Sequence, residues 1–364
     1  MSSVDQVPEY IRTLVPYAPG KPIEEVEREF GIANSIKLAS NENPLGPSPR
    51  AIRAIQERLD QLHLYPDGDC YYLKRGLANK LGVIPEQLIF GNGSNELLEL
   101  AVRTFMRPGD EAVMAQQAFV VYPLVVQAVG GGAKAVPLRN FTHDLEAIAQ
   151  QIGARTRVVF LANPNNPTGT IFRRHEWERF LENLRPDVLV IVDEAYFEYV
   201  DDPDYPNSLS YQAGAKTLLT LRTFSKLYGL AGLRIGYGVG SPAIIDLMQR
   251  VRQPFNVNAA AQWGALAALD DHDHVRKSLE LNRQGKDFLT REIIKLGLPY
   301  ITSQANFILI HVGRGYELFQ QLLRQGVIVR PMGVYDLPQY VRVTVGTMEE
   351  NRQFIAALTK AMHA

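Results

Sequence analysis

Hydrophobic residues between about position 50 and position 250 form short runs that alternate with segments of helical spacing. The runs at 157–161 and 188–192 are bounded by polar turns, which is typical of strands buried on both faces of a parallel sheet. Strands that alternate with helices predict an α/β domain with a mostly parallel sheet. The expected strands are 88–90, 111–114, 157–161, 188–192, 217–221 and 235–239, and the expected helices are 51–62, 72–81, 95–105 and 174–184.

After about residue 250 the pattern changes, and it predicts a smaller α+β unit. Its expected helices are 262–269, 275–296, 316–324 and 349–362, and its expected strands are 307–310, 327–329 and 341–345. Passages rich in proline and glycine at 15–22, 41–49 and 65–68 predict extended or turning backbone, because proline fixes φ and blocks helix. We therefore expect an N-terminal arm over 1–45 that joins the small domain, a large domain over 46–250 and a small domain over 251–364.

Charge and cysteine content narrow the class of partner and the compartment. The formal net charge of −1, with no long run of one sign, argues against nucleic acid or a membrane as the main partner. The single cysteine, Cys70, excludes an intramolecular disulfide and suits a reducing compartment. Neither a signal peptide nor an apolar run approaching ~18 residues is present, so we expect a cytoplasmic protein.

Four short segments combine residue types that suit the binding of a ligand. The first is 91–96 (Gly-Asn-Gly-Ser-Asn-Glu), between an expected strand and an expected helix. The glycines permit close backbone approach, and the N–H groups at a helix N-terminus attract a phosphate, so Gly93, Ser94 and Asn95 are candidates for a phosphate site. An ordinary helix cap formed by Ser94 or Asn95 is the alternative.

Two further segments follow expected strands directly. The loop 163–169 (Asn-Pro-Asn-Asn-Pro-Thr-Gly) lies where α/β proteins bind ligands, although a simple proline-rich turn is the alternative. The acid Asp193 could cap the next helix or hold Mg²⁺, but no GxxxxGK[ST] loop accompanies it, which excludes a P-loop nucleotide site. A carboxylate in this place also suits a pyridinium nitrogen, because it keeps that nitrogen protonated.

The fourth segment is 223–234, which places Lys226 among hydroxyl and small residues. Lysine attacks a carbonyl only as the free amine, so a reactive lysine needs surroundings that lower its pKa. Thr223 and Ser225 supply hydroxyls, and Arg234 supplies a forked cation that suits a phosphate.

These motifs, in this order along the chain, resemble the fold type I enzymes that depend on pyridoxal 5′-phosphate (PLP), the aspartate aminotransferase superfamily. The resemblance covers nearly the whole length and includes Thr-x-Ser-Lys with an arginine eight residues later, Asn-Pro-Thr-Gly and Asp-Glu-Ala-Tyr. It implies an enzyme with a large domain built on a mostly parallel seven-stranded sheet and with PLP as its cofactor. No metal site is expected.

The resemblance also implies a role for each motif residue. Lys226 would hold PLP as a Schiff base and move the proton, and Asp193 would pair with the pyridine nitrogen. Asn166 and Tyr196 would hydrogen-bond the phenolic oxygen of the cofactor. Phe119 would stack on the ring where many relatives have tyrosine, with core packing as the alternative. The cofactor phosphate would be held by Gly93, Ser94, Asn95, Thr223, Ser225 and Arg234.

A finer resemblance is to the histidinol-phosphate aminotransferases, carried by segments outside the cofactor motifs at 14–22, 38–44, 65–67, 329–331 and 341–346. It implies that one anion site accepts both the phosphate of L-histidinol phosphate and a carboxylate of glutamate. Arg330 and Arg342 would form that site because guanidinium pairs with either anion, and Tyr17 would add a hydroxyl. Tyr65 would reach the cofactor phosphate of the neighbouring subunit, which makes the enzyme a homodimer. Surface positions for the two arginines, and a packing role for Tyr17, are the alternatives.

The implied reaction is transamination between L-histidinol phosphate and 2-oxoglutarate in histidine biosynthesis. An aromatic amino acid aminotransferase and a threonine-phosphate decarboxylase share every cofactor residue and remain alternatives. A transcription regulator would join this fold to a DNA-binding domain, for which the chain leaves no room because its motifs begin within the first fifty residues.

Overall fold

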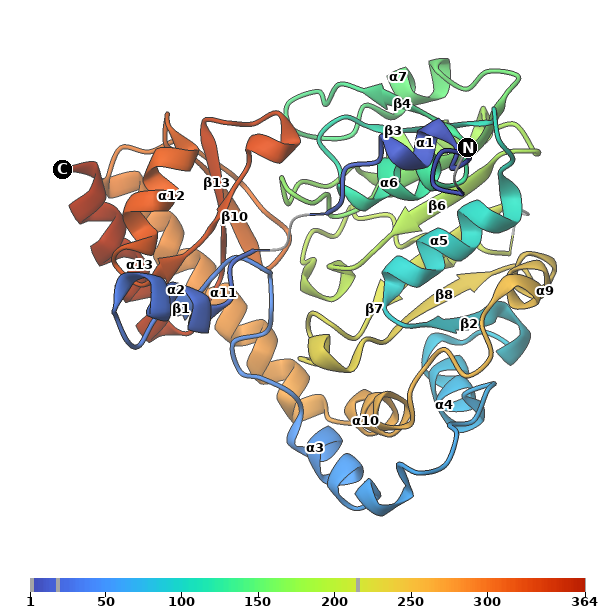
Figure 1. Ribbon diagram of the computed structural model, residues 1–364, viewed down its shortest axis with the longest axis horizontal. Coiled ribbons are helices and arrows are strands. Elements are labelled where there is room, and N and C mark those ends of the chain that lie inside the picture. The colour runs from blue at the N-terminus through green and yellow to red at the C-terminus, as the bar shows by residue number, and fades with distance from the viewer. Residues whose placement is uncertain (1–2, 18–19, 214–216, 364) are drawn as a thin grey trace.

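A seven-stranded sheet forms the centre of the larger unit in this computed structural model, which describes residues 3–17, 20–213 and 217–363. Its strand order is β2-β8-β7-β6-β5-β3-β4, and β8 runs antiparallel to both neighbours while the other described pairs are parallel. The predicted mostly parallel sheet is therefore confirmed (Figure 1). The strands are β2 (Leu88–Gly91), β3 (Glu111–Ala115), β4 (Gly132–Val136), β5 (Thr156–Ala162), β6 (Leu189–Asp193), β7 (Leu218–Thr223) and β8 (Gly236–Gly240).

Helices cover both faces of this sheet, and alternate residues of its strands point to opposite faces. On β5, Val158 and Phe160 belong to one buried cluster with helices α5, α6 and α9, whereas Val159 and Leu161 belong to another with α7 and α8. A third cluster joins β2 and β8 to α4 and α10. These helices are α4 (Tyr71–Leu81), α5 (Ser94–Phe105), α6 (Val121–Ala128), α7 (Leu145–Gln150), α8 (Arg174–Glu182), α9 (Pro242–Val251) and α10 (Ala259–Leu269).

The smaller unit is a four-stranded antiparallel sheet, order β12-β13-β10-β9, packed against three helices. Its strands are β9 (Tyr300–Ile301), β10 (Phe307–His311), β12 (Arg330–Pro331) and β13 (Tyr340–Thr344), and its helices are α11 (His272–Lys295), α12 (Gly315–Leu323) and α13 (Met348–Met362).

The N-terminal segment contacts both units (Figure 1). Strand β1 (Ile36–Lys37) pairs in parallel with β11 (Val327–Ile328) of the smaller unit, next to α2 (Ile23–Phe30). The short helix α1 (Glu9–Arg12) lies instead against α6 of the larger unit. The domain boundaries at 45 and 250 stay a prediction.

Several elements differ from the predicted ones for identifiable reasons. The helix expected over 51–62 is α3 (Pro49–Gln56), which starts earlier because Ser48 caps it and Pro49 occupies its first turn, and a 3₁₀ turn over Leu59–Gln61 follows it. The helix expected from 275 begins three residues earlier, after the cap Asp271. None of the helices in the described ranges is both long and apolar enough to cross a membrane.

Candidate active site

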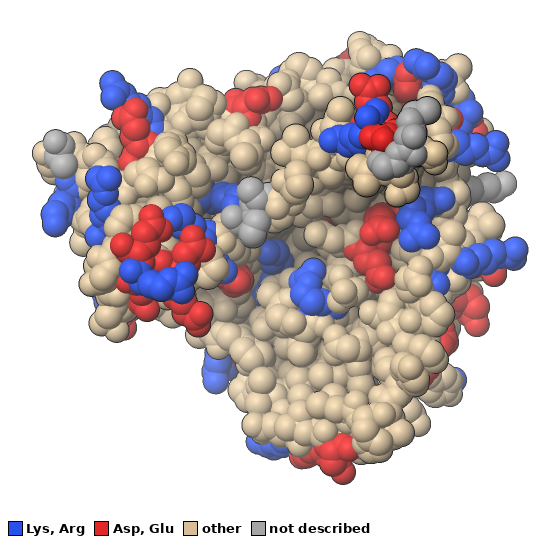
Figure 2. Space-filling view, in the orientation of Figure 1, with Lys and Arg blue, Asp and Glu red and all other residues tan. Residues whose placement is uncertain are grey.

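One cavity of about 410 Å³ lies beyond the carboxyl ends of β5, β6 and β7, between the two units. Residues 91–96, 163–169, 193–196 and 223–234 each follow a strand, and the parallel arrangement brings them to one edge of the sheet. Figure 2 shows the hollow with basic side chains on its wall. The predicted site residues that line it are Tyr17, Ser94, Asn95, Phe119, Asn166, Asp193, Tyr196, Thr223, Ser225, Lys226, Arg234, Arg330 and Arg342.

Lys226 lies three residues beyond β7 and extends into the cavity. Its Nζ donates to the carbonyl oxygen of Ser40 at 2.9 Å and lies 5.6 Å from the centre of the Tyr196 ring. Burial, followed by the positive charge of Arg342, lowers the pKa of Lys226 to about 8. A larger fraction of this amine is therefore free near neutral pH than for an exposed lysine, as a nucleophilic amine requires.

Asp193, the last residue of β6, presents a buried carboxylate to the same cavity. Its Oδ2 accepts a hydrogen bond from the hydroxyl of Tyr122 at 2.9 Å, and its Oδ1 accepts one from the backbone N–H of Ala195 at 3.1 Å. Burial raises the pKa of Asp193 to about 6, and the hydrogen bond from Tyr122 opposes that rise. The group is thus an anion at neutral pH that can accept a hydrogen bond from a protonated ring nitrogen.

Arg342, Asn166 and Tyr196 place polar side chains in the lining of the cavity. Arg342 is buried on β13, where Nη2 donates to the carbonyl oxygen of Ala39 at 2.7 Å and Nη1 donates to Oδ1 of Asn166. The hydroxyl of Tyr196 accepts from Nδ2 of Asn41 at 2.8 Å, and burial raises the pKa of this phenol to about 12. Tyr196 therefore keeps its own proton and can donate a hydrogen bond to an oxygen in the cavity.

A phosphate cradle lies where residues 91–96 meet Arg234. Gly93 caps α5 with a φ of +80°, and a Cβ at this position would overlap Nη2 of Arg234. The Nη1 of Arg234 donates to Oγ of Ser225 at 3.4 Å, and the backbone N–H of Ser225 donates to Oγ1 of Thr223 at 3.1 Å. A helix N-terminus that faces a guanidinium and two hydroxyls suits a phosphate.

Together with Lys226 and Asp193, this cradle fits a phosphorylated pyridine aldehyde such as PLP. The amine would take the aldehyde and the carboxylate would face the ring nitrogen. Phe119 lines the cavity and meets Tyr122 edge-on at 5.7 Å between ring centres, so its ring is held by that contact and can stack on a planar ligand.

Two further residues predicted to bind the substrate are Arg330, from the smaller unit, and Tyr17, from the N-terminal segment. The guanidinium of Arg330 on β12 lies 5.7 Å from the centre of the Tyr17 ring, and both residues line the cavity. Tyr65 lies apart from this chain's cavity. Its side chain is 83% exposed and stacks on Phe255 at 4.9 Å.

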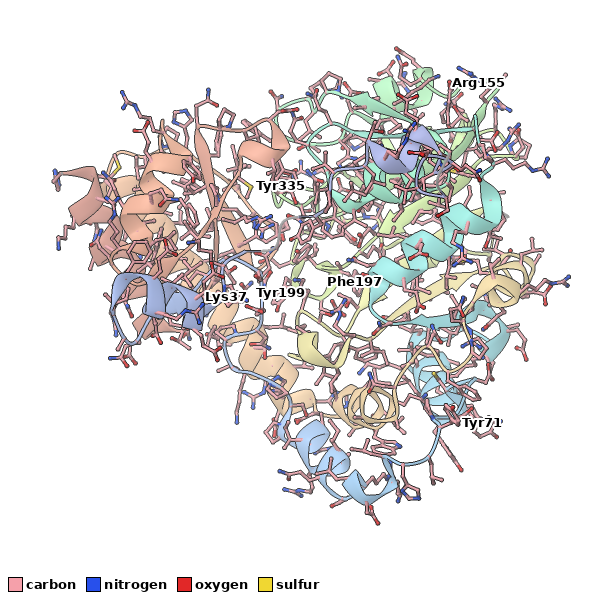
Figure 3. All side chains as sticks on the ribbon, in the orientation of Figure 1. Lys37, Tyr71, Arg155, Phe197, Tyr199 and Tyr335 are labelled. Atoms are coloured by element: carbon pink, nitrogen blue, oxygen red, sulfur yellow. The ribbon has the colours of Figure 1, made fainter. Side chains whose placement is uncertain are left out.

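Sequence reasoning assigned no role to several residues that the fold brings to the cavity. Tyr122 follows Phe119 by three residues, and that spacing within one turn could have suggested a second inward-facing ring. Asn41 and Glu42 lie in a segment that marked the family but had no assigned function. Tyr335, labelled in Figure 3, lines the cavity from the smaller unit, and no local pattern indicated it.

Comparison with known proteins agrees with this arrangement. Residues 33–358 match the family model described as aminotransferase class I and II. The chain therefore belongs to the class I and II aminotransferases.

Within that family, the chain is similar to histidinol-phosphate aminotransferases. That of Moorella thermoacetica is 52% identical over 364 residues, which cover 100% of this chain and 94% of the relative. That of Caldicellulosiruptor saccharolyticus is 49% identical, over 97% of this chain and 99% of the relative. The crystal structure of histidinol-phosphate aminotransferase from Sinorhizobium meliloti in complex with pyridoxal-5′-phosphate superposes with a TM-score of 0.91 at 27% identity, covering 98% of this chain and 97% of that one. The predicted family, fold class, enzyme class and cofactor are confirmed.

Proposed function

We propose that this aminotransferase moves the amino group of L-histidinol phosphate to 2-oxoglutarate, giving 3-(imidazol-4-yl)-2-oxopropyl phosphate and L-glutamate, as a step of histidine biosynthesis. The observation that carries the proposal is one cavity lined by two cationic groups, the Gly93–Arg234 cradle and the pair Arg330 and Arg342, together with Lys226. Relatives that match nearly the whole chain at about 50% identity are named histidinol-phosphate aminotransferase, which supports the choice of substrate.

The cofactor residues divide into holding and proton-moving groups. When bound, PLP supplies an electron sink for breaking the C–H bond at the amino-bearing carbon. Gly93 and Arg234 hold its phosphate, and Asp193 holds the ring nitrogen in its protonated form. Nζ of Lys226 would attach the cofactor, and as a free amine it would take a proton from the amino-bearing carbon as a general base and return one as a general acid. Tyr196 donates a hydrogen bond to the phenolic oxygen.

Substrate anions bind at Arg330 and Arg342 of the cavity lining. Arg342 is held by Asn166 and by the Ala39 carbonyl, so its guanidinium is oriented before the substrate arrives. Preorganised donors lose little entropy on binding. Arg330 and Tyr17 complete an anion site that accepts either the phosphate of the amino donor or a carboxylate of the acceptor.

The proposed assembly is a homodimer with shared active sites in the cytoplasm. Around α3, α4 and α10 the chain exposes large apolar side chains, and the corresponding lower part of the molecule in Figure 2 carries few charged atoms. A patch of this kind is typical of an interface between subunits. In the proposed dimer the exposed ring of Tyr65 enters the neighbouring cavity. The exposed apolar residues are Leu59, Leu62, Leu64, Tyr65, Tyr71, Tyr72 and Phe255.

Hybrid dimers test the shared site. We expect Lys226→Ala and Tyr65→Ala homodimers each to be strongly impaired, because each damages every site. Dissociating and mixing the two proteins would create dimers in which one site receives both defects and the other receives neither. Activity that returns after mixing supports the shared site. Activity that stays at the level of the parent variants contradicts it.

The amino-donor assignment is tested by a half-reaction. The holoenzyme is mixed with L-histidinol phosphate, L-phenylalanine or L-threonine phosphate in separate stopped-flow experiments, and the absorbance of the bound cofactor is followed. We expect the second-order rate constant to be greatest for L-histidinol phosphate. A faster response to phenylalanine would identify an aromatic amino acid aminotransferase, and release of CO₂ from threonine phosphate would identify a decarboxylase.

A further inference from the structure

Tyr122 connects the buried acid of the site to its aromatic wall. The side chain is fully buried, and its ring stacks on Phe160 of β5 with 4.8 Å between centres and 10° between planes. The same ring meets Phe119 at 86°, and its hydroxyl donates to Oδ2 of Asp193 at 2.9 Å. The sheet on one side and Phe119 on the other therefore fix the direction of this hydroxyl.

The hydroxyl of Tyr122 is a permanent donor. Burial and the negative charge of Asp193 both raise the pKa of Tyr122 well above its ordinary value. The phenol thus keeps its proton throughout the working pH range, and the partner it has in the described residues is a carboxylate oxygen. A donated hydrogen bond of this kind stabilises the ionised carboxylate and disfavours its protonated form.

Burial raises the pKa of Asp193. The other charged and titratable groups around it either raise this pKa further or lower it less than Tyr122 does. Glu194 raises the pKa of Asp193, and Lys226 lowers it. Glu194 is itself paired with Arg222 at 2.7 Å, with both side chains buried. The hydrogen bond from Tyr122 is the largest of the contributions that oppose burial, followed by the backbone N–H of Ala195. The phenol of Tyr196 also interacts with Asp193 through space.

We propose that Tyr122 is a positioning residue for the cofactor: its hydroxyl keeps Asp193 ionised and aims the carboxylate at the pyridine nitrogen, so that this nitrogen stays protonated at neutral pH. The inference deepens the proposed use of PLP and is independent of which amino donor the enzyme prefers. Tyr122 acts through Asp193 and does not itself exchange a proton with the substrate.

Tyr122→Phe is the direct test, because it keeps the stacked ring and removes only the hydroxyl. The affinity of the apoenzyme for PLP is measured from pH 5 to pH 9 by the quenching of protein fluorescence. Binding needs the ionised acid, so removing a donor that favours this form moves the acid-side midpoint of the affinity to higher pH. We expect a shift of about one to two pH units, the range for a hydrogen bond to a charged group. Because the pKa of Asp193 is about 6, that shift weakens the affinity about 2- to 10-fold at pH 7 and about 10- to 100-fold well below both midpoints.

The half-reactions supply a second readout that depends on chemistry. Because Asp193 serves every substrate, the Tyr122→Phe holoenzyme should lose the same factor in the rate of the chemical step with L-glutamate and with L-histidinol phosphate. Its apparent affinity for either donor should change little. If the histidinol-phosphate assignment were wrong, only the relative rates of the donors would show it, and the pH midpoint for PLP would still report on Tyr122.

Tyr205→Phe is the matched control. Tyr205 is also a buried tyrosine, and its hydroxyl donates to the backbone carbonyl of Asn163 at 2.6 Å and not to the carboxylate of Asp193. We expect this variant to lose stability like Tyr122→Phe and to keep the wild-type pH midpoint. An equal shift in both variants would overturn the proposal, as would a wild-type midpoint in Tyr122→Phe.

A second variant covers the case in which Tyr122→Phe does not fold. Site-specific replacement of Tyr122 with 3-fluorotyrosine keeps the ring and the hydroxyl and makes the phenol a stronger donor. The proposal then expects the acid-side midpoint to move to lower pH, the direction opposite to that of the phenylalanine variant. No movement, or movement to higher pH, would overturn it.

Discussion

Arg342 gives the sharpest test of how one site accepts two kinds of anion. Its guanidinium donates to the Ala39 carbonyl at 2.7 Å and to Asn166, and it lies 5.2 Å from the centre of the Phe307 ring. Arg342→Met fills most of the same volume without the charge. The substrate anion would then be buried without its partner, which costs about 3–5 kcal/mol for a broken buried pair.

That cost corresponds to a loss of roughly 10²- to 5 × 10³-fold in kcat/KM, because each 1.36 kcal/mol is about tenfold. Steady-state assays should show this loss for L-histidinol phosphate and for 2-oxoglutarate alike. Arg342→Lys keeps the charge and loses the two-point geometry, so we expect an intermediate value. Arg314→Met removes an exposed arginine of the smaller unit and should leave both values unchanged.

The Arg342→Met substitution should also change the pKa of Lys226. The charge of Arg342 is the second cause, after burial, that lowers the pKa of Lys226 to about 8. Removing it raises that pKa, so less free amine is present at any pH below it. The pH at which PLP incorporation into the apoenzyme reaches half its maximum rate should therefore increase.

For the Arg342→Met variant, unchanged kcat/KM for both anionic substrates, or a loss for only one of them, would refute a shared site at Arg342.

Three further predictions concern the cofactor site and its support. Gly93→Ala places a Cβ against Arg234 at a φ of +80°, so the dissociation constant for PLP, measured by fluorescence titration, should increase about tenfold or more. Arg222→Met leaves the buried Glu194 unpaired and should lower the free energy of unfolding in urea by about 3–5 kcal/mol. Burial raises the pKa of Asp193 to about 6 and binding needs its ionised form, so the affinity of the apoenzyme for PLP should be full well above pH 6 and lost as the pH falls through that value.

The central strands and the cofactor residues were predictable because local sequence determines both. Val158 to Leu161 on β5 form an apolar run that is typical of a strand buried on both faces, and Asp193 and Lys226 lie at or just beyond the ends of such runs. Parallel strands bring their carboxyl ends to one edge, so residues far apart in sequence could be expected to meet there. The edge strand β4 was missed because it is largely exposed and its sequence, Gly-Ala-Lys-Ala-Val, lacks that run.

Residues placed by tertiary packing were not predictable in the same way. Asn41 reaches Tyr196 across 155 positions of sequence, because the N-terminal segment passes between the two units. Tyr122 belongs to α6, a helix that is apolar on nearly all sides, so its sequence did not indicate which ring faces Asp193. The roles of the individual site residues stay predictions that the substitutions above test.

The account depends most on the covalent attachment of the cofactor to Lys226. Holoenzyme reduced with borohydride and digested should yield one modified peptide, and mass spectrometry should place the pyridoxyl group on Nζ of Lys226. A modification at another lysine, or holoenzyme that forms normally and turns over at the wild-type rate with Lys226→Ala, would contradict the account.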